Sequence, residues 1–268
     1  MNKSISRINA MFLRYVFLHK RSVPRTFEII FWPVMELLVW GFVSVYIQNV
    51  SGSALVKIAQ ALINAMIFWD ILYRSQQGVS ISFIEDIWTQ NILNLLISPL
   101  KIWEWVTATF IYGVVKTSLI TLILASLAYL FYRFDLIANL HFYLIPLVFN
   151  LLLFGWALGI FTSGLIIRWG HAAEALIWGI PFLVQPISAI FYPLATLPGW
   201  LQVISKALPS TYVFEGMRAV IQTGQMPRDY FLIGFLLNLI YFALAGLFFN
   251  WMYKESRASG RLGRLGMD

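Results

Sequence analysis

Side chains that could perform chemistry are few in this chain, and their spacing matches no common catalytic or metal-binding motif. His19, His141 and His171 are far apart in the sequence and do not form the HExxH pair that binds zinc. Ser98 and Lys101 have the SxxK spacing of a nucleophile and its base, but the proline between them and a position at a membrane interface make chance the better explanation. No Walker loop or GxGxxG motif occurs, so we expect a chain that is not an enzyme and binds no metal, cofactor or ATP itself.

Three ionisable residues, Glu36, Asp70 and Lys116, lie in or near long apolar runs. An unpaired charge inside a membrane costs several kcal/mol, so such residues are candidates for function by default. A role in a transport pathway is one interpretation. The other, which the cost of an unpaired charge favours, is structural pairing with one another or with Arg74.

The composition indicates a membrane protein. Of the 268 residues, 60% are hydrophobic and 12% are charged, and the mean hydropathy is +0.76. Soluble domains are usually about 25% charged. Apolar runs of about 20 residues match the hydrocarbon core of a bilayer, and runs that are continuous rather than alternating favour helices over a β-barrel. The absence of cysteine excludes disulfides and thiolate metal sites. We therefore predict an all-α integral membrane protein.

We predict six membrane-spanning helices, at about 26–48, 55–74, 101–132, 140–167, 175–193 and 230–252. Lysine and arginine gather in the segments that would face the cytoplasm if both termini lay there, which is the usual orientation signal. That bias explains the net charge of +7 without a nucleic-acid partner. The expected organisation is a cytoplasmic amphipathic helix at 1–25, a six-helix transmembrane domain at 26–253 and a basic cytoplasmic tail at 254–268. We expect the cytoplasmic membrane of a bacterium as its location.

The first segment is amphipathic at helical spacing. Arg7, Arg14 and Arg21 fall on one side, and Ile8 and Phe12 fall on the other. We expect this helix to lie in the cytoplasmic interface with its arginines toward lipid headgroups. A simple topology signal is the alternative.

A second amphipathic stretch, "SFIEDIWTQNILNLLISPLKIWEW", occupies residues 82–105. Ile84, Ile87, Trp88 and Leu95 share one helical face, whereas Glu85, Asp86, Gln90 and Asn94 lie mostly elsewhere. We expect one short helix at 83–98, which ends before Pro99. The pattern suits docking onto a soluble partner and equally suits a helix resting on the membrane.

The stretch between the last two predicted spans is long and interrupted. Pro193, Pro198, Gly199 and Pro209 break it, and Trp200 lies in an apolar strip between the breaks. Glu215 and Arg218, at positions i and i+3, can neutralise each other. We expect broken, re-entrant helices at 193–222, which form either a gate or a folded outer loop. Gly155 and Gly159 form a GxxxG motif that could serve packing within the subunit or dimerisation.

Two of these stretches resemble the signatures of ABC-2 type exporter permeases. The segment "EDIWTQNILNLLISPL" is similar to the one that precedes the third span in that family, and "LPGWLQVISKALPSTYVFEGMRAV" is similar to its outer signature. Trp88 and Thr89 stand where many relatives have Gly-Thr. Six spans, a basic amphipathic N-terminus and the chain length agree with the same resemblance.

The resemblance implies a role for each segment. The first helix, with Arg7, Arg14 and Arg21, would be an interface helix beside a separate ATP-binding subunit. The helix at 83–98 would be a coupling helix, which fits a groove of that subunit. Its contact residues would be Glu85, Asp86, Trp88, Asn91, Leu95, Ser98 and Pro99. The outer gate segment would include Pro198, Gly199, Trp200, Pro209, Glu215 and Arg218. Two permeases would assemble with two ATPases, which would hold the ATP and Mg²⁺.

The expected function is export of an amphipathic or lipid-linked molecule by alternating access, driven by the separate ATPase. Relatives carry lipid-linked polysaccharides, lipids or hydrophobic drugs. One alternative is a secondary carrier driven by an ion gradient, which would predict inverted repeats and an ionisable cluster at mid-membrane. A membrane scaffold without transport activity is the other alternative.

Overall fold

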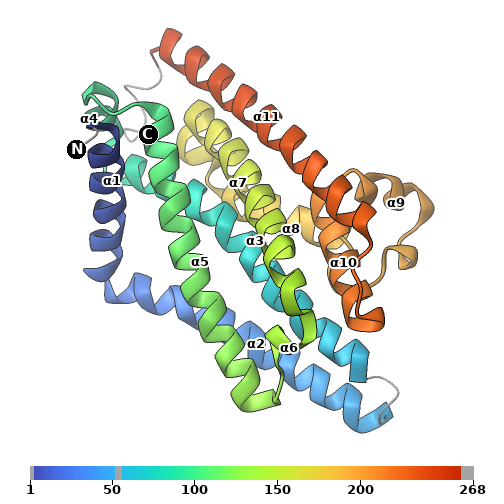
Figure 1. Cartoon of the computed structure of the whole chain (residues 1–268). Coiled ribbons are helices and arrows are strands. Elements are labelled where there is room, and N and C mark those ends of the chain that lie inside the picture. The colour runs from blue at the N-terminus through green and yellow to red at the C-terminus, as the bar shows by residue number, and fades with distance from the viewer. Residues whose placement is uncertain (1–2, 52–55, 261–268) are drawn as a thin grey trace.

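The computed structural model of the chain describes residues 3–51 and 56–260, and most of these residues are helical (Figure 1). The helices are α1 (Lys3–Lys20), α2 (Val23–Ser51), α3 (Val56–Trp88), α4 (Ile92–Ile97), α5 (Ile102–Tyr132), α6 (Leu136–Leu140), α7 (Leu144–Trp169), α8 (Ala175–Ile187), α9 (Gly199–Lys206), α10 (Pro209–Thr223) and α11 (Arg228–Ala258). Short 3₁₀ turns occur at His141–Tyr143, Gly170–Ala173 and Leu194–Thr196. No strand occurs within the described ranges, so the all-α prediction is confirmed.

Four stretches of the described chain are long and apolar enough to cross a membrane: Ile30–Val50, Ile102–Tyr132, Leu136–Ala173 and Arg228–Ala258. They coincide with four of the six predicted spans. The other two predicted spans fall on α3 and α8, which differ from the expectation in opposite ways.

Helix α3 is longer and more polar than the predicted span at 55–74. Its 33 residues extend about 50 Å at the usual rise of a helix. It packs against α2, α5 and α7, and almost every side chain from Ile63 to Ile87 is buried. Because neighbouring helices cover it, α3 can carry Asp70, Arg74 and several amides without exposing them to lipid.

Helix α8 is shorter than the predicted span at 175–193. It has 13 residues and ends at Ile187, so it extends about 20 Å, less than the hydrocarbon core of about 30 Å. Pro181 and Pro186 lie inside it. Beyond Ile187 the chain turns into the irregular stretch that leads to α9 and α10.

The prediction of one helix at 83–98 is wrong. Helix α3 continues to Trp88, a turn follows, and α4 starts only at Ile92. Gln90 adopts a left-handed backbone conformation with φ of 53°, which ends the helix. The apolar period continues across this turn, so periodicity alone does not reveal the break.

Glycines allow α3 to approach its neighbours closely. A Cβ atom on Gly155 of α7 would lie 2.8 Å from the carbonyl oxygen of Leu72, and one on Gly159 would lie 2.9 Å from that of Gln76. On the other side of α3, a Cβ on Gly78 would lie 2.9 Å from the Cα of Gly113 in α5. The GxxxG motif therefore serves packing within the subunit.

The N-terminal end of α1, the short helix α4 and the C-terminal end of α11 lie at the same end of the bundle (Figure 1). The C-terminal end of α7 lies there too, because it contacts the C-terminal end of α11. Arg168 at the end of α7 pairs with Glu255 of α11 at 2.6 Å, and the hydroxyl of Ser256 donates to the carbonyl of Ile167 at 3.0 Å. We call this the α4 end of the molecule.

Candidate functional site

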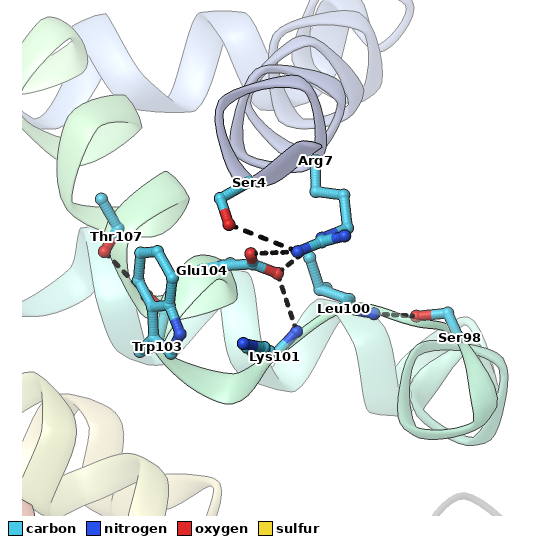
Figure 2. Close-up of polar contacts among 8 residues, drawn as sticks. All are labelled: Ser4, Arg7, Ser98, Leu100, Lys101, Trp103, Glu104 and Thr107. Atoms are coloured by element: carbon cyan, nitrogen blue, oxygen red, sulfur yellow. Dashed lines mark hydrogen bonds and ion pairs between the residues drawn. The ribbon is translucent and has the colours of Figure 1, made fainter. Parts of the chain in front are cut away.

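The stretch between α3 and α5, residues 89–101, includes most of the exposed part of the predicted coupling helix at 83–98, and we call it the α4 segment. Trp88 just before it is 41% exposed, and Ile97 within it is 83% exposed. Asn94 and Pro99 are exposed too, whereas Asn91, Leu95 and Ser98 are half-buried. The hydroxyl of Ser98 donates to the Leu95 carbonyl at 2.7 Å, which shapes the turn before Pro99. It also accepts the Leu100 amide at 3.3 Å (Figure 2).

Two residues predicted to contact a partner are instead buried. The exposed fractions of Glu85 and Asp86 are 4% and 0%. Both belong to the last turns of α3, where α1 covers Asp86. Neither carboxylate is therefore exposed to a protein that docks on the α4 segment. Asp86 instead holds α1 in place.

Asp86 lies at the centre of a polar network that joins three helices. It forms an ion pair with Arg14 of α1 and accepts a hydrogen bond from the hydroxyl of Tyr15 at 3.2 Å. The Tyr15 oxygen in turn accepts the indole N–H of Trp105 in α5 at 2.7 Å. Burial raises the pKa of the Asp86 carboxyl, and the hydrogen bond from Arg14 opposes that rise.

A second carboxylate, Glu104 at the start of α5, was not predicted from the sequence. Its two oxygens accept the Nε and Nη2 groups of Arg7 at 2.8 and 2.6 Å, and its side chain is fully buried (Figure 2). One of these oxygens also accepts the backbone N–H of Lys101 at 2.9 Å. Glu104 thus forms one half of a capping box, in which the side chain three residues after the N-cap accepts the N-cap amide. The sequence signature is incomplete because Lys101 at the N-cap has no acceptor for the other half.

The predicted orientation of the first helix is therefore wrong for two of its three arginines. Arg7 and Arg14 point toward carboxylates of α5 and α3, and their side chains are 26% and 27% exposed. The face of α1 that carries Met11 and Tyr15 is buried. Leu13 and Phe17 are exposed on the remaining surface of α1, and Arg21 is exposed just beyond its end.

A cavity of about 710 Å³ lies between α2, α3, α5 and α8 and reaches the α4 end of the molecule. Its walls are rich in aromatic rings: Trp32, Trp40, Trp69, Tyr73, Trp88, Trp178 and Phe182. Its charged lining residues are Glu36, Asp70, Arg74, Glu85 and Lys116.

The cavity brings together the intramembrane charges that the sequence singled out. Asp70 pairs with Arg74 at 3.1 Å, which confirms the expected structural pairing for that aspartate. Glu36 and Lys116 line the same space. Pairing and exposure to a pathway are thus compatible interpretations, because the ion pair itself lies in the cavity wall.

The cavity and the α4 segment meet at Trp88. This residue lines the cavity, is the last residue of α3 and directly precedes the α4 segment. Its indole N–H donates to the carboxylate of Glu174, just before α8, at 3.3 Å. A displacement of the α4 segment would therefore also displace Trp88 in the cavity wall.

The stretch predicted to be re-entrant, residues 193–222, contains the short helices α9 and α10, and we call it the outer segment. Two charged residues hold its pieces together. Glu215 and Arg218 form the predicted ion pair at 2.7 Å. Arg218 also donates to the carbonyls of Ala189 and Ile190 at 2.6 and 2.9 Å, and Glu215 accepts the Leu194 amide at 2.7 Å. These bonds fix the irregular stretch after α8 against α10.

The remaining residues predicted for this segment lie at the breaks. Pro198 and Gly199 stand at the start of α9, and Pro209 is the first residue of α10. Trp200 is 69% exposed on α9. Pro209 thus begins a helix, as the fixed φ angle of proline favours, and Pro198 is the N-cap of α9.

Comparison with known proteins gives the family. Among curated proteins, none matches the chain. The family described as ABC-2 type transporter matches residues 11–221, which include α3, the α4 segment, α9 and most of α10. Because this match covers most of the chain, the protein belongs to the ABC-2 type transporter family as a transmembrane permease subunit, a multi-pass membrane protein.

Proposed function

We propose that the protein is the permease subunit of an exporter that moves an amphipathic or lipid-linked molecule out of the cytoplasm, driven by a separate ATP-binding subunit. The observation that carries this proposal is the meeting of cavity and α4 segment at Trp88. A protein that docks on the α4 segment and moves it would also move Trp88 in the cavity wall. Movement of the ATP-binding subunit could in this way act on a molecule bound in the cavity.

The proposed topology has six passes, formed by α2, α3, α5, α7, α8 and α11, with both termini and the α4 segment in the cytoplasm. Burial supports α3 as a pass despite its polar residues. The short helix α8 would cross only part of the bilayer, and α9 and α10 would form the re-entrant remainder. Irregular backbone at that depth is tolerated where protein covers it, and Arg218 satisfies two of its carbonyls.

The cavity supports an amphipathic cargo. Aromatic faces stack on sugar rings and acyl chains, and the charges of both signs provide partners for a polar headgroup. Lipid-linked polysaccharides, lipids and hydrophobic drugs all meet this description.

In the proposed mechanism, ATP binding closes two nucleotide-binding subunits, and the α4 segments of two permeases move with them. Each nucleotide state favours one packing of the two permeases, so the cargo path faces the cytoplasm in one state and the outside in the other. The outer segment would act as the gate. A Glu215→Ala variant, which releases Leu194, should then transport more slowly; unchanged transport would contradict the gate role.

The decisive experiment is co-purification of the permease with its ATPase, followed by transport in liposomes that contain both. We expect hydrolysis of ATP that rises with candidate cargo and transport that persists when an ionophore has removed all ion gradients. Transport that needs a gradient and no nucleotide would establish a secondary carrier instead.

A further inference from the structure

Two ion pairs tie α1 to both ends of the α4 segment. Asp86 lies three residues before that segment and binds Arg14, and Glu104 lies three residues after it and binds Arg7. Arg7 and Arg14 are two helical turns apart on α1, about 10 Å along its axis. One rigid helix thus bridges the C-terminal end of α3 and the N-terminal end of α5.

The ion pair between Arg7 and Glu104 also fixes the orientation of the two side chains. Arg7 presents two N–H groups to the two carboxylate oxygens, a fork that fixes orientation more strongly than a single contact. Ser4, one turn earlier on α1, accepts from the same guanidinium at 3.3 Å (Figure 2). Because Glu104 also accepts the Lys101 amide, the carboxylate that binds α1 also sets where the α4 segment ends and α5 begins.

The attachment at Asp86 reaches into the α4 segment itself. The backbone N–H of Asn91 donates to the Asp86 carbonyl at 2.9 Å, and Arg14 holds the carboxylate of the same residue. Tyr15 adds its hydroxyl to that carboxylate and receives the indole N–H of Trp105. The start of the α4 segment is therefore fixed to the residue that α1 binds.

The other end of α1 leads to the cavity. His19, in the last turn of α1, lines the cavity wall. The corner that follows is hydrogen-bonded, since the hydroxyl of Thr26 in α2 donates to the His19 carbonyl at 3.1 Å. Helix α2 then supplies Trp32, Glu36 and Trp40 to the same wall.

We propose that α1 is a brace that moves with the α4 segment as one body and carries its displacement to α2 and the cavity wall. This inference rests on the proposed function, because the displacement comes from the ATP-binding subunit. A shift of the α4 segment away from α1 would strand two buried carboxylates without their arginines, which is far more costly than moving the helix along. Arg7, Arg14, Asp86 and Glu104 are thus positioning residues for coupling and not contacts with the ATPase.

Distance measurements between spin labels can test the brace, because the chain has no cysteine and accepts labels cleanly. Asn9 on α1 and Asn94 in the α4 segment are both exposed and report on the brace. Asn94 paired with Gln225, an exposed residue between α10 and α11, reports on movement of the α4 segment against the rest of the bundle. Both pairs are introduced as cysteines into the full permease–ATPase complex and measured without nucleotide and after trapping with ATP and vanadate.

The proposal predicts that trapping changes the distance from residue 94 to residue 225 and leaves the distance from residue 9 to residue 94 unchanged. If both distances change, the brace is refuted while the proposed function stands. If the distance from residue 94 to residue 225 does not respond to nucleotide in an assembled complex, the proposed function fails, and the brace fails with it.

Neutral variants separate the ion pair from its structural surroundings. Glu104→Gln keeps an oxygen for the Lys101 amide but removes the charge that holds Arg7. We expect Glu104→Gln and Arg7→Gln each to make the distance from residue 9 to residue 94 change on trapping and to lower cargo-stimulated ATP hydrolysis, with the double variant no worse than either single one. Arg228→Gln, at an exposed arginine that begins α11, is the control and should behave as the wild type. Additive losses in the double variant would contradict the brace.

Discussion

At the scale of single residues, the buried carboxylates at the α4 end determine how α1 is held. Asp86 illustrates why the sequence misleads. Its position next to Glu85 in an amphipathic stretch predicts exposure, yet both residues are buried. Helical periodicity reports which residues share a face, but it does not report that a distant segment, here α1, will cover the polar face.

Removal of the Asp86 carboxylate should destabilise the protein. In an Asp86→Ala variant, Arg14 loses its partner in a buried site, and Tyr15 loses its acceptor. The loss of one member of a buried ion pair typically costs about 3–5 kcal/mol. Denaturant unfolding in detergent measures the change. The control is Glu255→Ala, which breaks the more exposed pair with Arg168 and should cost about 0–1 kcal/mol. Equal losses in both variants would contradict the role given to Asp86.

Replacement of Arg218 should loosen the outer segment even when the new residue is lysine. Its guanidinium serves two carbonyls and one carboxylate at once, and an ammonium group cannot reproduce that planar fork. A hydrogen bond to a charged group contributes about 1.5–3 kcal/mol, so we expect amide hydrogen exchange at 188–197 to accelerate about tenfold or more in Arg218→Lys. Arg228→Lys, at an exposed arginine nearby in the sequence, should leave exchange unchanged. Slow exchange in both variants would show that the outer segment is held by other contacts.

At the scale of helices, the sequence predicts the long apolar helices well and the polar or short ones poorly. The spans that coincide with α2, α5, α7 and α11 are apolar along their length, and hydropathy detects them directly. For α3, the sequence predicts only a span at 55–74, because Arg74 and the amides that follow it are polar, and other helices cover them in a way that no local pattern records. The break between α3 and α4 depends on the backbone of Gln90, a residue type without a strong preference for that conformation.

Close packing of α3 against α7 should fail when a side chain is added at the glycine pair. In Gly155→Ala the new Cβ would lie 2.8 Å from the Leu72 carbonyl oxygen, so the helices must separate. Overpacking of this kind typically costs about 1–3 kcal/mol. Thermal unfolding in detergent is the measurement. Gly246→Ala in α11, where nothing lies within 4 Å of the added Cβ, is the matched control. A normal unfolding temperature for Gly155→Ala would contradict the packing described here.

The exposed side of the α4 segment should be sensitive to charge if it is a docking surface. Ile97 is 83% exposed and makes few contacts to lose, so Ile97→Asp should leave folding intact. Loss of a central apolar anchor typically costs 2 kcal/mol or more, so we expect recovery of the co-purified ATPase to fall about tenfold or more. Ile137→Asp in α6, at a comparably exposed isoleucine, is the control. Normal recovery with Ile97→Asp would place the docking surface elsewhere.

At the scale of the whole molecule, the account joins three parts that lie far apart in the sequence. The α4 segment provides an exposed surface, α1 braces its two ends, and the cavity begins where Trp88 ends α3. The sequence could suggest the first part through its resemblance to ABC-2 permeases. It could not suggest the cavity, because its walls come from five helices that are separated in the sequence.

The most direct test of the account is the side of the membrane on which the α4 segment lies and what it touches there. A single cysteine at Asn94, in a chain that has none, can be probed in cells with a membrane-impermeant maleimide and then with a photo-crosslinker. The account predicts no labelling in intact cells, labelling after permeabilisation, and a crosslink to the ATP-binding subunit. Labelling of intact cells at residue 94 would contradict it.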